Sequence, residues 1–329
     1  MIKESALINS FLDKNSSFRR YVFNNLGKYL TFVFLCGKKL EPNDNRSFIK
    51  DNIVNAEGKI SILSEDLYSL FKDSNLDLLT IEEILLDIST AVILIIESYG
   101  SACELGAFSF SNNTVNKLWV INDNKHKSPD SFIESGPLSK IKKYRPDQVF
   151  YLNFKADNNI DFDSRTVDAL SKIEKRTFSA KTVRRENDIL VISDLSFLIC
   201  FLFDFAKTFG IIFKEQVYDL VKNYIDTSSN KYKAINIRFQ SGNIFDDQPL
   251  VKSIIEQMID LLVGINLLQK KNNRKTEYYI MNYDFIKKLG FDISSFDSLL
   301  FQSSFFNGSR INEIDKLKNK LIKSGFELW

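Results

Sequence analysis

Five short runs of apolar and β-branched residues recur along the first half of this 329-residue chain, and they constrain its fold more than any other feature. The runs span residues 31–35, 59–63, 90–96, 117–121 and 149–152. Their continuous apolar character is typical of strands that are buried on both faces of a parallel sheet. Segments with helical spacing lie between them, at residues 46–54, 66–73, 81–88 and 101–111. The alternation predicts an α/β domain with a Rossmann-like, doubly wound parallel sheet.

The character of the sequence changes near residue 155. Beyond it, long helical patterns replace the strand rhythm, and the six basic residues of segment 172–185 predict an exposed helix joining two domains. An amphipathic helix at 250–262 is followed by a short turn and a hairpin at 267–281, an order that resembles the recognition helix and wing of a winged-helix domain. We therefore expect an α/β domain over residues 1–155 and a mostly helical domain with a winged-helix element over residues 156–329.

The net charge of the chain gives no global attraction to nucleic acid or to an anionic membrane. Lys and Arg number 44 against 42 acidic residues. A local patch is still present at the tip of the predicted hairpin, where four of six positions are cationic: Lys270, Lys271, Arg274 and Lys275. Wings use such residues on the phosphate backbone, and the same pattern is also common in solvated hairpins. Both interpretations remain open from the sequence.

Cysteine and histidine usage excludes several classes of site. The cysteines Cys36, Cys103 and Cys200 are far apart and lack metal-ligand spacing, which favours a reducing cytoplasm and argues against a metal site. His126 is the single histidine and lies in a polar stretch, so a His-dependent catalytic triad is not expected. The first thirty residues lack the apolar core of a secretory signal, and no apolar run is long enough to span a membrane.

Unusual residues gather where the predicted strands end. Ligands of open α/β sheets bind beyond the carboxyl ends of the strands, where loops and helix N-termini converge. The residues expected at that edge are Cys36 and Gly37 after the first strand, Glu65 and Asp66 after the second, and Glu97, Gly100 and Ser101 after the third, which lead into a helix carrying Glu104.

Local patterns also offer plainer explanations for these acids. Ser101 and Glu104 fit a capping box, in which the glutamate would only satisfy a backbone amide. Thr80 and Glu83 fit the same pattern at the start of the preceding helix. Taken singly, Glu65, Asp66 and Glu97 could be ordinary solvated carboxylates.

The run from Gly100 to Phe108, Gly-Ser-Ala-Cys-Glu-Leu-Gly-Ala-Phe, resembles the signature of nucleoside 2-deoxyribosyltransferases. Segments 34–37, 64–67, 78–85 and 131–138 are further similar to effector proteins of bacterial retron antiphage systems, which join such a domain to a winged-helix domain. The resemblance implies that Glu104 is the nucleophile and that Glu97 and Glu83 lie near two further active-site carboxylates. It also places Arg46 where phosphate or pyrophosphate would be contacted, with a solvated helix-start arginine as the alternative.

The resemblance implies an N-glycosidase that acts as a retron toxin in abortive infection, partnered by the retron reverse transcriptase and its RNA–DNA product. A carboxylate below the anomeric carbon stabilises or captures an oxocarbenium-like centre. Nicotinamide leaves as a neutral base, so the absence of an acid histidine favours NAD as substrate, without any added cofactor. A non-catalytic, nucleotide-sensing DNA-binding regulator and a salvage deoxyribosyltransferase remain alternatives, and the open sheet is compatible with a homo-oligomer.

Overall fold

The computed structural model describes residues 30–38, 44–65, 68, 76–155, 160–174, 183–224, 232–239, 241–273, 276–288 and 308–328. The chain divides into two compact units. One comprises Tyr29–Arg176 together with Phe239–Asn243, and the other comprises most of the remaining chain. Asp66, Arg274 and Lys275, which the sequence singled out, lie outside the described residues, as does most of the helix predicted at 66–73.

The first unit is built on a five-stranded parallel sheet with strand order β2-β1-β3-β4-β5. This confirms the predicted sheet, with each strand within two residues of its predicted bounds. The strands are β1 (Phe32–Cys36), β2 (Ile60–Ile62), β3 (Ala91–Ile95), β4 (Leu118–Asp123) and β5 (Val149–Leu152). All five residues of β1 and of β3 are buried, as their uninterrupted apolar runs predicted.

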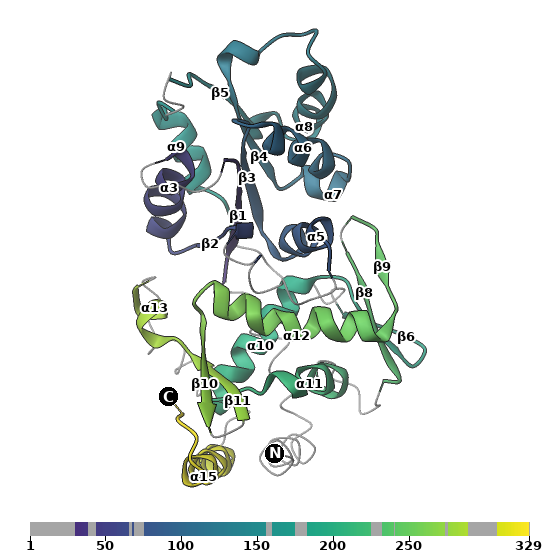
Figure 1. The fold of residues 1–329 in the computed structure, drawn as a ribbon, viewed down its shortest axis with the longest axis vertical. Coiled ribbons are helices and arrows are strands. Elements are labelled where there is room, and N and C mark those ends of the chain that lie inside the picture. The colour runs from purple at the N-terminus through teal and green to yellow at the C-terminus, as the bar shows by residue number, and fades with distance from the viewer. Residues whose placement is uncertain are drawn as a thin grey trace. The chain divides into compact units, whose positions relative to one another are not determined.

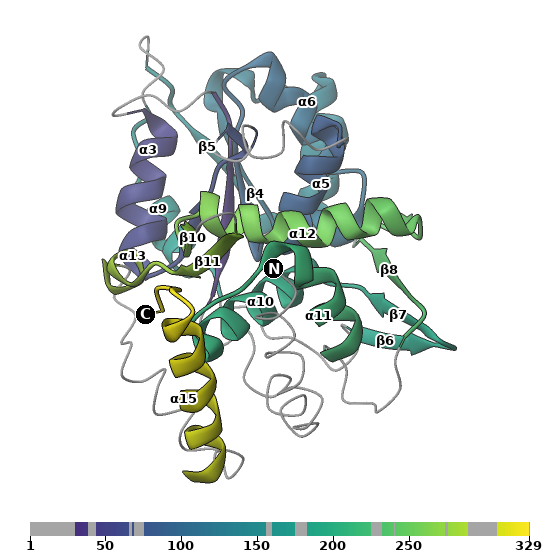
Figure 2. The same cartoon turned by 60° about the horizontal axis from the view of Figure 1, so that its bottom comes forward.

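Helices cover both faces of this sheet. Figures 1 and 2 show α3 and α9 on one face, and α5, α6, α7 and α8 on the other. These helices and the short turns of the unit are α3 (Asn45–Ile49), η1 (Lys50–Val54), η2 (Asn55–Glu57), α5 (Leu78–Ile88), α6 (Tyr99–Phe108), α7 (Asn112–Val115), η3 (Asn124–His126), η4 (Glu134–Leu138), α8 (Ser139–Tyr144), η5 (Pro146–Gln148) and α9 (Ser164–Ser171). The helices predicted at 46–54, 81–88 and 101–111 correspond to α3 with η1, to α5 and to α6.

The first unit extends to Arg176 rather than ending at residue 155. Helix α9 explains the difference, because Leu170 and the following Ile173 are buried in the same apolar core as Ile49, Ile53 and the inward residues of β1 and β3. An isolated antiparallel bridge between Phe154 and Ile160 leads the chain from β5 toward this helix. The hydrophobic cover of one sheet face therefore comes partly from beyond the predicted boundary.

The second unit combines helices with two small sheets. The strands are β6 (Val183–Glu186), β7 (Ile189–Ile192), β8 (Ala234–Arg238), β9 (Ile244–Phe245), β10 (Leu268–Asn273) and β11 (Thr276–Met281). The helices are α10 (Leu195–Phe209), η6 (Lys214–Gln216), α11 (Val217–Tyr224), α12 (Gln248–Gly264), α13 (Tyr283–Lys288) and α15 (Gly308–Lys323). Strands β6 to β9 form one mixed sheet in that order, and β10 pairs with β11 as an antiparallel hairpin.

Of the two predictions for this region, the first is wrong in part and the second is confirmed. The helix predicted across 172–185 is wrong at both of its described ends, because α9 ends at Ser171 and Val183–Glu186 is a strand. That strand pairs with β7, where its partners Leu190, Val191 and Ile192 are buried. The helix, turn and hairpin predicted between residues 250 and 281 are confirmed as α12, β10 and β11. None of the helices in the described part of the chain is long and apolar enough to cross a membrane.

The extended boundary can be tested with Leu170, which is 1% exposed. We expect Leu170→Ala to destabilise the first unit by about 2–5 kcal/mol, the usual cost of truncating a buried leucine. Native-state hydrogen exchange at the amides of β3 and β4 measures the effect. The exposed Arg165 on the same helix supplies the control, Arg165→Ala. Unchanged protection in Leu170→Ala would show that the sheet is complete without α9.

Candidate active site

The strand order makes the loops diverge at one edge of the first sheet. Strand β1 pairs with β2 on one side and with β3 on the other, so the chain turns in opposite directions after β1 and after β3. Loops that part in this way leave space beyond the carboxyl ends of the strands, which is where open α/β sheets bind ligands. Cys36 ends β1, Glu65 follows β2, and Glu97 follows β3 at this edge.

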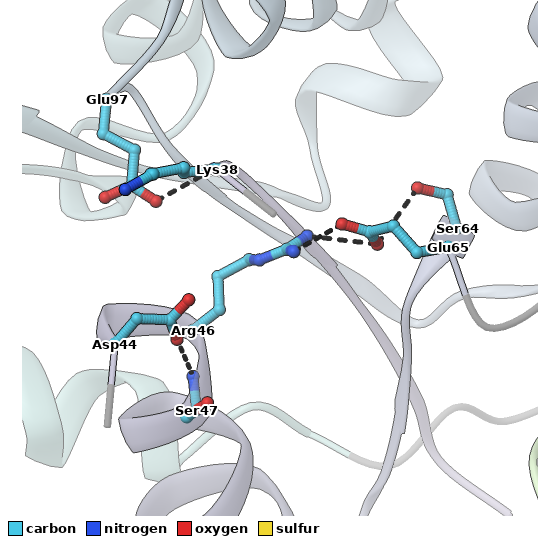
Figure 3. Close-up of polar contacts among 7 residues, drawn as sticks. All are labelled: Lys38, Asp44, Arg46, Ser47, Ser64, Glu65 and Glu97. Atoms are coloured by element: carbon cyan, nitrogen blue, oxygen red, sulfur yellow. Dashed lines mark hydrogen bonds and ion pairs between the residues drawn. The ribbon is translucent and has the colours of Figure 1, made fainter. Parts of the chain in front are cut away.

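Glu97 ties the two central loops together (Figure 3). Its Oε1 accepts a hydrogen bond from the backbone amide of Lys38 at 2.9 Å. Its Oε2 accepts one from Asn45 Nδ2 at 3.1 Å. Gly37 makes this approach possible, since it has a φ of +150° and a Cβ there would lie 3.1 Å from Glu97 Oε1. The glycine expected to admit a ligand admits the Glu97 carboxylate instead. Both oxygens of the Glu97 carboxylate accept hydrogen bonds from the protein, so this residue positions the loop after β1.

Arg46 is the cation of the site and is 2% exposed. Its Nη2 and Nη1 donate to the two carboxylate oxygens of Glu65 at 2.5 and 3.3 Å, a two-point ion pair that Figure 3 shows reaching across from α3. Its Nε has no hydrogen-bond partner among the described residues. The solvated arginine that the sequence left open is therefore excluded. A phosphate contact would require the anion to share or replace Glu65.

Glu104 lies on α6, away from the helix end. The helix begins at Tyr99, and its capping box is formed by Ser98 and Ser101, each side chain bonding the other residue's backbone amide. The capping box predicted for Ser101 and Glu104 is wrong because the helix starts earlier than that pattern assumed. Ser101 is consequently 1% exposed and engaged within the protein, while the neighbouring Gly100 is exposed.

The Glu104 carboxyl is partly buried and electrostatically crowded. Its Oε2 is buried without a hydrogen-bond partner in the described part of the chain. Burial, followed by the negative charge of Glu82, raises its pKa from 4.5 to about 7, while Arg46 acts in the opposite direction. A carboxyl group with a pKa of about 7 at the carboxyl ends of the strands is a candidate catalytic group.

Glu82, one residue from the predicted Glu83, faces this cluster. Burial and the charge of Glu65 raise the pKa of Glu82. Glu83 instead accepts hydrogen bonds from Asn243 Nδ2, at 2.8 and 3.0 Å, and from Ser241 in the same compact unit. Helix α5 is capped by Asp77, not by Thr80, so the predicted box at Thr80 and Glu83 is also wrong. Both glutamates lie off the apolar face of α5, and periodicity had no means of choosing between them.

Two further residues complete the description of this edge. Burial and then the charges of Glu104 and Glu82 raise the pKa of the Cys36 thiol well above its ordinary value, so the thiol stays neutral and is no thiolate nucleophile. Asn122 near the end of β4 is 1% exposed, and its Nδ2 lacks a partner among the residues that the structure describes. The sequence analysis missed Asn122, although a polar residue closing a buried strand was a usable signal. Within the described ranges, no group of side chains has the composition of a metal site.

Comparison with known proteins identifies the family of the chain. Residues 42–270 match the family model of the STM3845 retron effector protein. The chain belongs to this family of retron effectors. Among curated proteins of Escherichia coli, the retron Ec73 putative ribosyltransferase/DNA-binding protein is 27% identical over 324 residues, covering 90% of each chain. The retron Ec86 putative ribosyltransferase/DNA-binding protein is 27% identical over 238 residues, covering 70% of this chain and 71% of that one.

The basic hairpin of this effector is already engaged in ion pairs. Lys270 pairs with Glu277 across the β10–β11 hairpin, and Lys271 Nζ lies 3.3 Å from Glu327 Oε2. All four of these side chains are at least one-third exposed, so each pair is weak and can exchange with another anion. Neither described lysine at the hairpin is therefore a simple solvated cation.

The crowding of Glu104 predicts a stability effect that depends on pH. A carboxyl whose pKa is raised on folding stays protonated in the folded protein after it has ionised in the unfolded chain, so the penalty grows as the pH rises from 4.5 and is complete above about 7. We expect Glu104→Gln, which stays neutral, to stabilise the effector by roughly 1–2 kcal/mol at pH 8 after allowance for solvent screening, and by much less at pH 5. Thermal or urea unfolding at the two pH values measures this. The exposed Glu57→Gln is the control, and a destabilised Glu104→Gln protein at pH 8 would contradict the placement.

Proposed function

We propose that this retron effector cleaves the N-glycosidic bond of NAD or a related nucleotide, with Glu104 as the nucleophile. The observation that carries the proposal is the Glu104 carboxyl itself, which is partly buried at the strand-order reversal and has one oxygen without a partner among the described residues. An unpaired carboxylate oxygen costs stability in a folded protein, and such costs are concentrated at functional sites. The names of the two relatives, putative ribosyltransferases, support a reaction at a ribosyl carbon.

The reaction is a double displacement at the anomeric carbon. The ionised Glu104 oxygen forms a bond to that carbon while the bond to the base nitrogen breaks and its electron pair leaves with the base. Nicotinamide departs as a neutral molecule because the ring nitrogen was cationic in NAD. Water then attacks the glycosyl ester, releasing ADP-ribose, the free carboxylate and one proton. The positive charge on the nicotinamide ring of the substrate drives departure of the base, so no histidine is required as a general acid.

The surrounding charges suit this reaction. Developing positive charge on the sugar ring is favoured by the negative charges of Glu104 and Glu82. Glu82, whose pKa is raised, is our candidate for holding sugar hydroxyls or accepting the proton of the attacking water. The buried guanidinium of Arg46 is our candidate for the phosphate contact, with exchange of its partner from Glu65 to the substrate.

The pH dependence tests the nucleophile. We expect kcat/KM for nicotinamide release from NAD to rise with pH through a limb near 7, because the nucleophile must be ionised in the free enzyme. Glu82→Gln removes a charge that raises the Glu104 pKa, so its limb should move to lower pH. Glu83→Gln is the matched control on the same helix and should leave the limb in place.

Three results would count against this account. Full activity of Glu104→Gln would exclude the nucleophile, and an unmoved limb in Glu82→Gln would exclude the electrostatic coupling. Cleavage of other nucleotides with no release of nicotinamide would reject NAD as the substrate. If an added free base captured the glycosyl group in place of water, the enzyme would be a transferase, as the names of the two relatives suggest for those proteins.

We further propose that the second unit contains a winged-helix element that associates with the retron reverse transcriptase and its RNA–DNA product during antiphage defence. The order of elements supports it: α10, a bridge from Ile212 to Tyr279 of β11, then α11 and, after the inserted strands β8 and β9, α12 and the β10–β11 hairpin. In this arrangement the short segment at Ile212 adds a third antiparallel partner to the hairpin, as the first strand of a winged helix does. The Lys271 pair at the hairpin is exposed enough to exchange Glu327 for a phosphate.

Opposite changes at one ion pair test the hairpin. We expect Lys271→Ala to weaken binding to the RNA–DNA product and to reduce the slope of log affinity against log salt by about one. Glu327→Gln should instead tighten binding, because it removes the acid that competes with phosphate for Lys271. Fluorescence anisotropy across a salt series measures both. Identical affinity in both variants would remove the hairpin from the nucleic-acid interface.

A further inference from the structure

Asn45 lies at a junction between three segments that are far apart along the chain. It is the first residue of α3, which follows β1, and it is 5% exposed. Its Nδ2 donates to Glu97 Oε2 at 3.1 Å, in the loop after β3. Its Oδ1 accepts a hydrogen bond at 2.8 Å from the backbone amide of Ile160, which follows β5. One buried side-chain amide thus joins the segments that follow β1, β3 and β5.

The segment that contains Ile160 contacts α3 a second time. Phe48 lies three residues after Asn45, and its ring stacks on Phe162 with centroids 4.8 Å apart and an interplanar angle of 14°. The sequence assigned the residues beyond 155 to another domain. In the structure, the part around Ile160 instead holds the first turn of the helix that carries Arg46.

The Arg46 side chain passes beside this junction. A Cβ at Gly37 would lie 3.1 Å from Glu97 Oε1 and 3.4 Å from Arg46 Cδ, so the carboxylate and the arginine stem lie against the same glycine. Arg46 is 2% exposed, and a closely packed side chain cannot move independently of its neighbours. A shift of Glu97 or of the start of α3 would therefore redirect the guanidinium.

The direction of the two hydrogen bonds makes asparagine specific for position 45. An ionised Glu97 only accepts and the Ile160 amide only donates, so the side chain between them must offer one donor and one acceptor. Asparagine offers both on a short side chain, whereas an ionised aspartate has no donor. Sequence patterns did not single out Asn45, because its two partners are 52 and 115 residues away.

We propose that Asn45 is a positioning residue of the active site: by joining Glu97 to Ile160, it holds α3 so that the Arg46 guanidinium is directed at the phosphates of a bound nucleotide. Asn45 acts through Arg46, since both polar atoms of its own side chain are bonded within the protein. The inference rests on the phosphate contact proposed for Arg46 and not on the reaction proposed for Glu104.

Exchanging the donor and the acceptor tests this junction on the full chain. At pH 8, Asn45→Asp sets two carboxylates against each other, and Glu97→Gln sets two amide donors against each other, because Ile160 holds the oxygen of Asn45. The double variant Asn45→Asp with Glu97→Gln restores the hydrogen bond in the reverse direction, keeps an acceptor for Ile160 and leaves the net charge unchanged. Asn52→Ala, an exposed asparagine shortly after α3, is the matched control.

Calorimetric titration with ADP and with adenosine, which lacks the phosphates, measures the preference for phosphate. We expect the wild-type protein and Asn52→Ala to bind ADP about tenfold more tightly than adenosine. Each single variant, Asn45→Asp or Glu97→Gln, should lose most of this preference, and the double variant should regain it. General damage to the fold would not be repaired by a second substitution, so the recovery reports on the hydrogen bond itself.

Several results would overturn the role of Asn45. One is a wild-type preference for ADP in the single variants, and another is a double variant that is unfolded or prefers ADP no more than they do. If a single variant fails to fold, the double variant alone decides. A loss of preference in Asn52→Ala would show that the effect does not depend on the junction. Equal binding of ADP and adenosine by the wild-type protein would remove the Arg46 phosphate contact and this inference together, while nicotinamide release through Glu104 is judged by its own pH dependence.

Discussion

The reversal of strand order between β1 and β3 is the constraint on which the candidate site depends. It forces the loops after these two strands apart, and the Glu97 carboxylate, which follows β3, holds them together by accepting hydrogen bonds from Lys38 and Asn45, which both follow β1. That bond needs a glycine at position 37, where a side chain would crowd Glu97. The helices that carry Arg46 and Glu104 start from these loops, so this contact constrains where those two side chains lie.

Charge balance gives the site its chemical character. Three carboxylates, Glu65, Glu82 and Glu104, share a partly buried space with one guanidinium, and Arg46 already pairs with Glu65. Burial and then the negative charge of Glu82 favour the protonated form of Glu104, which raises its pKa to about 7. A binding partner with positive charge at its reacting carbon relieves this repulsion. The same arrangement that costs folding energy thus favours an oxocarbenium-like transition state.

The two edges of the sheet differ in kind. The carboxyl edge presents crowded acids with one buried cation, which suits a reaction that develops positive charge. The amino edge presents a cavity of about 490 Å³ whose lining includes Trp119, Arg145 and Lys172. A single parallel sheet can hold both because each strand contributes its two ends to different environments.

Much of this followed from the sequence because it depends on local pattern. Five continuous apolar runs determined the parallel sheet, and the Gly100 to Phe108 run alone was enough to single out Glu104. The helix α12 and the β10–β11 hairpin could also be predicted from the sequence, since their periodicity is a property of neighbouring residues. The family match agrees with the resemblance to retron effectors that these segments carried.

Only the tertiary structure decided which acids meet. Glu82 and Glu83 are adjacent on one helix and equally polar, and the packing of α5 beside β1 sends the first toward Glu104 and the second toward Asn243. Ser101 does belong to a capping box, but as its second member rather than its first. Ser98 caps the helix three residues earlier than the sequence pattern assumed. The domain boundary likewise depended on α9 returning to cover the sheet. The sequence determined the elements and the central carboxylate, whereas contacts between residues distant along the chain determined their partners, since such contacts are set by how the faces of the elements pack together.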